Sequence, residues 1–136
     1  HREIFRFTRG MIAFRRAHPI LSKEQFYTDA EIHWFGPQGG LPNWADPKEK
    51  QFACLIHESE YQALYLMFNA GADAVVFGLP PVLPGARWHL AIDTAREAPQ
   101  DLFAVGKEPL WEDPQTYHLS PRSSAILLAR RTNCQR

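Results

Sequence analysis

The sequence predicts an all-β protein: an antiparallel Greek-key β-sandwich of about seven or eight strands, preceded by one α-helix. Three short apolar runs follow one another closely, at residues 64–70, 75–80 and 88–95. Turn-forming residues separate these runs, namely Gly71, Pro80, Pro81, Pro84 and Gly85. Apolar runs rich in β-branched and aromatic residues, bounded by glycine and proline, are typical of consecutive antiparallel strands. A helical period occurs only at the start of the chain.

The helix is expected over residues 2–17, because apolar residues recur there at steps of three and four. Ile4, Phe7, Met11 and Phe14 form the stripe, which is the spacing of one helix face. Pro19 ends the helix, since the residue before a proline is driven towards an extended conformation. An apolar stripe on a single helix must be covered by another surface. The chain also begins at His1 without a methionine, so we expect a fragment of a longer protein, with residues 1–22 as a terminal helix and linker and residues 23–136 as the sandwich.

After Pro19 the helical period disappears and strand patterns follow. Strands are expected at residues 32–35, 51–57, 62–69, 73–79, 87–93, 116–119 and 124–129, with residues 36–43 and 94–113 as turn-rich connections. Within residues 87–93, alternation predicts that Trp88, Leu90 and Ile92 face the core. The run Ala125–Ala129 does not alternate, so we expect it to be buried on both faces.

Composition excludes several classes of function. The 136 residues suffice for one domain, and 15 basic side chains balance 15 acidic ones, so no field attracts nucleic acid or an anionic membrane. Arg130, Arg131 and Arg136 are interpreted as a solvated tail. No apolar segment approaches the roughly 20 residues of a membrane span.

The two cysteines are too few for a disulfide framework. We expect Cys54, which lies in an apolar run, to be a buried thiol, whereas Cys134 lies in the polar end of the chain. A bridge between them is possible but unsupported, so a reducing, cytoplasmic location is expected.

No catalytic, metal or cofactor site is predicted. Catalysis by a pair of carboxylates would need two of them about 5 Å apart. The neighbouring acids all fall in turns or at polar edges, where carboxylates normally solvate the surface: Glu58 with Glu60, Asp46 with Glu49, and Glu112 with Asp113. The six histidines fall in separate elements without metal-ligand spacing. Ser123, His118 and Asp93 could form a triad only on paper, since no nucleophile elbow surrounds a serine.

Aromatic residues are the remaining candidates for binding. Trp44 and Trp111 lie in predicted loops, where an aromatic face could stack on a sugar ring. Anchoring of the loops by the same two side chains is the alternative. Trp88 alternates with core residues and Trp34 is expected to lie half-buried beneath the linker, so both are interpreted as structural.

Several sequence segments together resemble the C-terminal part of bacterial glycogen debranching enzymes of the isoamylase type, which belong to the alpha-amylase superfamily of glycoside hydrolases. The resemblance covers essentially the whole chain and rests on the order and spacing of residues 7–19 (FTRGMIAFRRAHP), 32–39 (IHWFGPQG), Asn43-Trp44, the central strand runs, and residues 122–128 (RSSAILL). Relatives usually carry an aspartate where this chain has Asn43, which puts one local loop contact in doubt.

The resemblance implies a parent enzyme with an N-terminal β-domain, a central (β/α)8 barrel whose last helix is residues 2–17, and this sandwich. Such a parent hydrolyses α-1,6 branch linkages in glycogen or limit dextrin with retention of configuration. Its catalytic residues lie on the barrel, so none is carried over and the fragment is expected to be inactive. We expect the sandwich to pack against the barrel of the same polypeptide; the alternative is a carbohydrate-binding module that tethers the enzyme to glycogen. Without a barrel, the helix should fold back on the sandwich or associate with a second copy.

Overall fold

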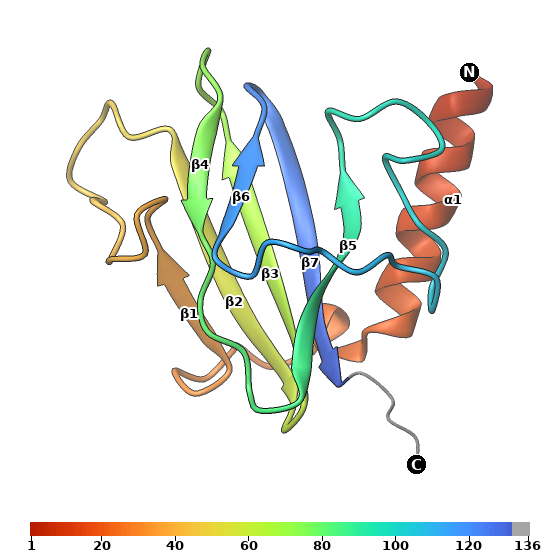
Figure 1. Ribbon diagram of the computed structural model, residues 1–136, viewed down its shortest axis with the longest axis horizontal. Coiled ribbons are helices and arrows are strands. Elements are labelled where there is room, and N and C mark those ends of the chain that lie inside the picture. The colour runs from red at the N-terminus through yellow and green to blue at the C-terminus, as the bar shows by residue number, and fades with distance from the viewer. Residues whose placement is uncertain (132–136) are drawn as a thin grey trace.

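The computed structural model describes residues 1–131 as one helix followed by strands in two antiparallel sheets (Figure 1). This confirms the predicted all-β sandwich with a helix before it. Cys134 and Arg136 lie outside the described residues. The elements are α1 (Arg2–Ala17), the short 3-10 turn η1 (Pro19–Ser22), β1 (Ile32–Phe35), β2 (Gln51–Ser59), β3 (Gln62–Asn69), β4 (Val75–Gly78), β5 (Ala86–Asp93), β6 (Thr116–Leu119) and β7 (Ser123–Arg131).

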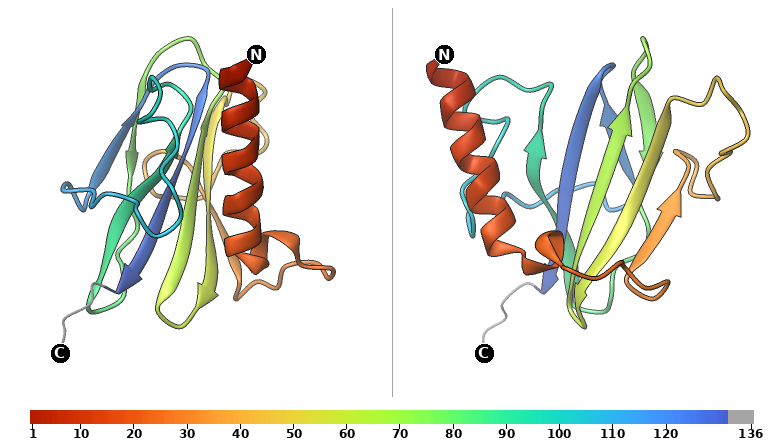
Figure 2. Two further views of the ribbon diagram at one scale, coloured as in Figure 1. Left: turned by 90° about the vertical axis from the view of Figure 1, so that its right-hand side faces the viewer. Right: turned by 180° about the vertical axis from the view of Figure 1, so that it is seen from behind.

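The molecule has three layers, seen edge-on in the left view of Figure 2. A five-stranded sheet with the order β1-β2-β3-β7-β5 forms the middle layer. The pair β4-β6 covers one face of this sheet, and α1 covers part of the other. From β3 onward each successive strand lies in the other sheet, which locks the two sheets together through their connections.

The first core fills the space between the sheets. Its largest side chains are fully buried, among them Tyr65, Phe77 and Tyr117. Val75 and Leu79 pack against the same cluster. The Tyr65 hydroxyl donates to the carbonyl of Gly78 in the opposite sheet (3.4 Å), and burial raises the pKa of Tyr65. This phenol therefore stays neutral while it bridges the two layers.

The second core lies beneath the helix. Phe14 is buried against Leu64, Leu128 and Ala91, and Phe7 and Met11 pack at its edge. The prediction that the helix folds back on the sandwich is therefore confirmed for these three side chains of the stripe. Ile4 remains 69% exposed in the single chain, so for this residue the fold-back alternative does not hold and burial against a second copy stays a prediction.

The predicted alternation of β5 is wrong at Ile92. Trp88 and Leu90 face the small sheet as expected, but Ile92 packs beneath the helix beside Ala91. The register with β7 explains this difference, since Leu90 pairs with Leu127 and Ile92 pairs with the next residue, Ile126. One extra residue of this kind is a β-bulge, which shifts the following side chains to the other face.

The last strand confirms one prediction and corrects another. Residues 125, 127 and 129 belong to the first core, and Leu128 belongs to the second, so β7 is buried on both faces. Arg130 and Arg131, interpreted above as a solvated tail, instead belong to β7 and pair with Arg87 and Ala86 of β5. No helix within residues 1–131 has the length and apolar character that crossing a membrane requires.

Candidate functional site

Trp44 lies in the long connection between β1 and β2 and is exposed, as the sequence predicts. Its side chain is part of an aromatic patch formed by Trp34, Trp44, Phe52 and Phe68. The ring of Trp44, which is 67% exposed, meets that of Trp34 edge to face at 5.7 Å. Phe52 stacks on Phe68 at 4.9 Å, across the β2–β3 pair.

The aromatic patch lies on the same face of the large sheet as α1. Phe52 precedes Ala53, which points into the first core between the sheets, so Phe52 points to the opposite face. Trp34 pairs with Cys54 and therefore shares that face. The helix covers strands β3, β7 and β5 through Leu64, Leu128 and Ile92, and it leaves the patch over β1 and β2 uncovered. This face is thus apolar beyond the edge of the helix.

Trp111 is not an exposed platform, and of the two roles that the sequence left open its contacts favour anchoring of the loop. Its indole is half-buried against the first core, and Nε1 donates to the carbonyl of Thr116 (3.0 Å). Its ring packs on Tyr117 at 4.6 Å. Trp111 therefore anchors the connection between β5 and β6, because both its donor and its ring surface are used within the fold.

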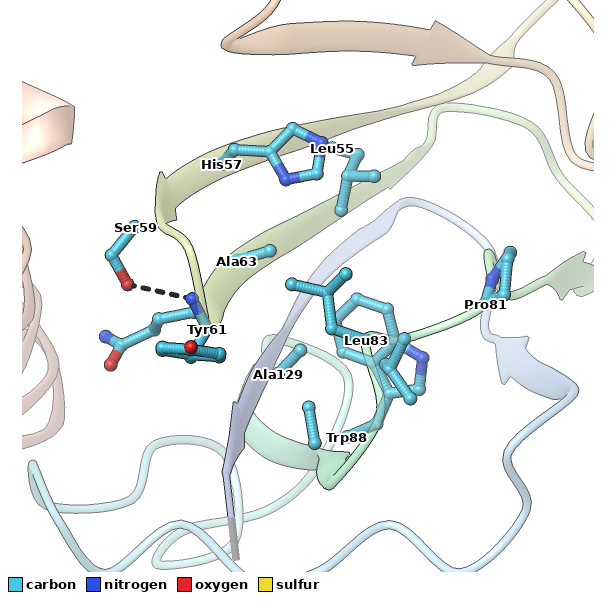
Figure 3. Close-up of a pocket in the computed structure, with 12 residues that line it drawn as sticks. Leu55, His57, Ser59, Tyr61, Ala63, Pro81, Leu83, Trp88 and Ala129 are labelled. Carbon is cyan, nitrogen blue, oxygen red and sulfur yellow. Dashed lines mark hydrogen bonds between the residues drawn. The ribbon is translucent and has the colours of Figure 1, made fainter.

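A small apolar cavity opens between the sheets at the end of the sandwich where the β2–β3 turn lies (Figure 3). Its volume is about 80 Å³, well below the roughly 300–1,000 Å³ of typical ligand pockets. The lining residues that the structure describes are apolar, apart from His57, Ser59, Tyr61 and Gln62. Burial and the neighbouring His33 lower the pKa of His57, so this imidazole is neutral at neutral pH. The lining described by the structure contains no carboxylate, whereas retaining glycoside hydrolysis uses two of them.

The acidic residues weighed as catalytic candidates serve the fold or point to solvent. Glu58 accepts hydrogen bonds from His18 Nδ1 (2.8 Å) and Gln62 Nε2 (2.7 Å). Asp113 accepts from the backbone N–H groups of Gln115 and Thr116 and from the Thr116 hydroxyl, and these hydrogen bonds lower its pKa. The remaining candidates, Asp46, Glu49, Glu60 and Glu112, are exposed.

No group of three metal-ligating side chains comes together within the part of the chain that the structure describes. Cys54 is buried, and burial raises the pKa of its thiol to about 11. At neutral pH this thiol is protonated and behaves as a small apolar side chain.

Sequence reasoning missed Phe52 and Phe68 as partners of the tryptophans. The register of the hairpin could have revealed them: the turn at Glu60 and Tyr61 places Phe52 opposite Phe68. An aromatic pair directly opposite on neighbouring strands stabilises a sheet, and here it also extends the exposed surface of Trp44.

Comparison with known proteins decides the family. Residues 33–127 match the model of the C-terminal domain of isoamylases 1–3. The chain belongs to the isoamylase C-terminal family. This confirms the resemblance to an isoamylase-type debranching enzyme, and it identifies the sandwich as a domain of such enzymes.

Individual relatives agree with this assignment. The chain is 32% identical to the isoamylase of Flavobacterium sp in an alignment of 144 positions, gaps included, that covers 91% of the chain and 18% of that protein. It is 32% identical to isoamylase 1, chloroplastic, of Arabidopsis thaliana, covering 94% of the chain and 17% of the relative. With isoamylase SU1, chloroplastic, of Zea mays it shares 34% identity over 76% of the chain and 13% of the relative. The chain thus spans less than a fifth of the length of these relatives.

Proposed function

We propose that this chain is the non-catalytic C-terminal domain of a debranching hydrolase that cleaves α-1,6 branch linkages of glycogen or limit dextrin with retention of configuration, and that it stabilises the catalytic barrel. The observation that carries the proposal is the position of α1. One side of this helix is packed on the sheet, whereas Ile4, Phe5 and Ile12 remain 69%, 64% and 48% exposed. A helix that is apolar on two sides is normally buried between two layers, and the second layer in this proposal is the barrel.

The attachment of α1 to the sandwich is specific and polar as well as apolar. Nη2 of Arg6 donates to both carboxylate oxygens of Asp101, at 2.9 and 2.7 Å, and such charge-assisted hydrogen bonds are stronger than neutral ones. At the other end of the helix, His18 is bonded to Glu58 of β2. The two ends of α1 are therefore held by different parts of the sandwich.

The absence of a catalytic role in the proposal is supported by the positions of the acids. The carboxylates weighed above are bonded within the fold or exposed in turns, and the cavity between the sheets is too small for a sugar ring to enter beside two of them. In a retaining hydrolase of this type the nucleophile and the acid would come from the barrel. For the parent enzyme we further propose a reducing, cytoplasmic location, in keeping with the buried free thiol of Cys54.

Two measurements test this proposal. The purified chain incubated with glycogen should release no reducing ends. In the parent enzyme, replacing both Ile4 and Phe5 by Asp should lower the melting temperature and the debranching rate together, whereas Phe26→Gln should change neither, since Phe26 is 98% exposed and lies outside the helix. Hydrolysis by the chain alone, or a parent enzyme indifferent to the double substitution, would refute the proposal.

The aromatic patch favours a second candidate, a carbohydrate-binding role. Trp44 and Trp34 present exposed rings at right angles on a surface that the helix leaves open, and aromatic rings bind the apolar face of pyranoses. Affinity electrophoresis in a glycogen-containing gel tests it: Trp44→Ala should abolish retardation and Trp111→Ala should not. If the unmodified chain is not retarded, this candidate is removed and the debranching proposal stands.

A further inference from the structure

A polar hollow lies beside the β2–β3 turn, outside both the aromatic patch and the helix attachment. The structure gives it a volume of about 650 Å³ and lines it with Ser59, Tyr61, Gln62, His89, Gly106, Arg130 and Arg131. These residues come from β2, β3, β5, β7 and their connections; the β2–β3 turn and the end of β7 meet at one end of the molecule (Figure 1). A hollow of this size can hold a small ligand.

The lining carries more positive than negative charge. None of the described lining residues is acidic. Arg130 is neutralised by Glu108, which lies behind the hollow: Arg130 donates to Oε1 at 2.6 Å and to the backbone carbonyl at 3.3 Å. Glu108 also accepts from the backbone N–H of Gly106 (3.0 Å), so the arginine and the loop are held in one arrangement. Glu108 thus compensates Arg130, one of the two arginines in the described lining.

Arg131 is the uncompensated cation. Its guanidinium carbon lies over the ring of Tyr61, 3.9 Å from the centroid, and within residues 1–131 no carboxylate forms an ion pair with it. A guanidinium stacked on an aromatic ring is oriented by that contact while its in-plane N–H groups stay free to donate. Such a pre-oriented fork matches two oxygens of a phosphate.

His89 adds a neutral partner to this site. It is 7% exposed, and its Nδ1 is bonded to the carbonyl of Arg87 (2.9 Å). Burial, followed by the charge of Arg130, lowers the pKa of His89, which agrees with a positive local potential. The neutral imidazole is therefore held in the wall of the hollow by its contacts with the backbone.

We propose that this hollow binds a phosphate group, either as free phosphate or as part of a phosphorylated sugar, with Arg131 as the principal ligand-binding residue. Phosphate is the occupant that the uncompensated guanidinium selects, and the exposed edge of Tyr61, with Gln62 and Ser59, leaves room for an attached sugar ring. The proposal is independent of the debranching function, because it depends on no barrel residue and no glucan substrate.

The test is a titration of the 136-residue chain at constant ionic strength, followed by calorimetry and by backbone amide shifts. Inorganic phosphate should bind saturably and shift the amide of Gly106. Arg131→Gln should weaken binding by about tenfold, the effect of losing a charge-assisted pair of hydrogen bonds, and Arg131→Lys should weaken it less. The charge-matched control is Arg2→Gln, which changes an exposed helix residue and should leave the affinity unchanged.

Further arms identify the source of the phosphate and guard against a folding artefact. Glucose 6-phosphate binding more tightly than phosphate identifies a phosphorylated sugar, and equal affinity identifies free phosphate; both support the site. Unchanged melting temperatures of the variants show that the fold is intact. Three results would overturn the proposal. In the first, neither probe binds saturably, and in the second, the Arg131→Gln variant binds phosphate with the affinity of the unmodified chain. The third is that neutral maltose binds equally strongly to the unmodified chain and to the Arg131→Gln variant.

Discussion

Two tryptophans that look alike in the sequence have different roles at the scale of single residues. Trp44 and Trp111 both lie in long connections rich in proline and glycine. Trp44 remains exposed beside another ring, whereas the N–H and much of the ring surface of Trp111 make contacts within the fold. The sequence alone could not distinguish the roles of the two tryptophans, because each role depends on which strand the loop crosses.

This difference predicts unequal costs of substitution. Trp44→Ala should lower the free energy of unfolding by less than about 1 kcal/mol, as for an exposed side chain. Trp111→Ala should cost about 3 kcal/mol, since it removes packed ring surface from the first core and leaves the Thr116 carbonyl without its donor. Urea unfolding of both variants checks this, with Trp111→Phe as the control that keeps an aromatic ring and removes only the indole N–H and part of the ring surface. Equal costs for the two alanine variants would contradict the assigned roles.

His89 makes stability depend on pH. Because its pKa in the folded state lies below the ordinary value of 6.5, the unfolded state binds its proton first as the pH falls. Stability is therefore fully present above about pH 6.5 and declines as the pH falls from there towards the lowered folded-state pKa, by at most about 1.4 kcal/mol per pH unit for one group.

Urea midpoints of the unmodified chain and His89→Gln, measured between pH 7.5 and 5, test this origin. The variant should show a shallower decline, whatever its absolute stability, because its side chain at position 89 cannot bind the proton. His118→Gln serves as control, since His118 is exposed on β6, and its decline should match that of the unmodified chain. A His89→Gln variant with an undiminished decline would place the pH dependence elsewhere.

At the scale of elements, the spacing of apolar residues and the positions of glycine and proline predicted the helix and strands closely. The helix bounds are those expected, since the apolar stripe and Pro19 define both its face and its end. Strands β1, β3 and β6 also begin and end where their apolar runs do. The bulge in β5 could not be predicted, because the run Trp88–Asp93 is equally compatible with a regular alternation. Only pairing with β7 shows where the extra residue lies.

Gly10 shows how the packing of an element overrides local propensity. In the sequence it is a weak point of the helix, about 1 kcal/mol worse than alanine. In the structure a Cβ at this position would lie 1.8 Å from Cδ2 of Leu102. Leu102 is part of the second core and reaches across the helix at the one residue without a side chain. The glycine thus allows close approach of the connection after β5.

A double-mutant cycle tests this explanation. Gly10→Ala alone should destabilise the chain by about 1 kcal/mol net, because overpacking costs more than the gain in helix propensity. In a Leu102→Ala background the same change should become stabilising by about 1 kcal/mol. Thr8→Ala, on the exposed side of α1, is the control and should have the same effect in both backgrounds. If Gly10→Ala has one sign in both, Leu102 is not the cause.

At the scale of the whole molecule, the order of the strands across two sheets was not accessible from the sequence. Local patterns give each strand a buried side, but they do not say which partner covers it. The aromatic patch and the polar hollow illustrate the consequence: Phe52 with Phe68, and Tyr61 with Arg131, are distant in sequence and meet only through strand pairing. The exposure of Asp46, Glu49, Glu60 and Glu112 was easier to predict, because each of these acids lies in a turn or at a polar edge.

The exposed side of α1 leads to the last prediction, on self-association. Ile4, Phe5 and Ile12 leave an apolar surface on a helix that is firmly held at both ends, so the helix cannot rotate to bury it. In the chain alone, a second copy is the available cover, and burial of apolar area favours pairing. Light scattering should show the mean mass rising above 15.6 kDa with concentration. Replacing Ile4 and Phe5 by Gln should restore the monomer, whereas Phe26→Gln, an isolated side chain that is 98% exposed, should not. A monomer at every concentration would show that this surface needs no cover, and it would weaken the case for a barrel packed against it.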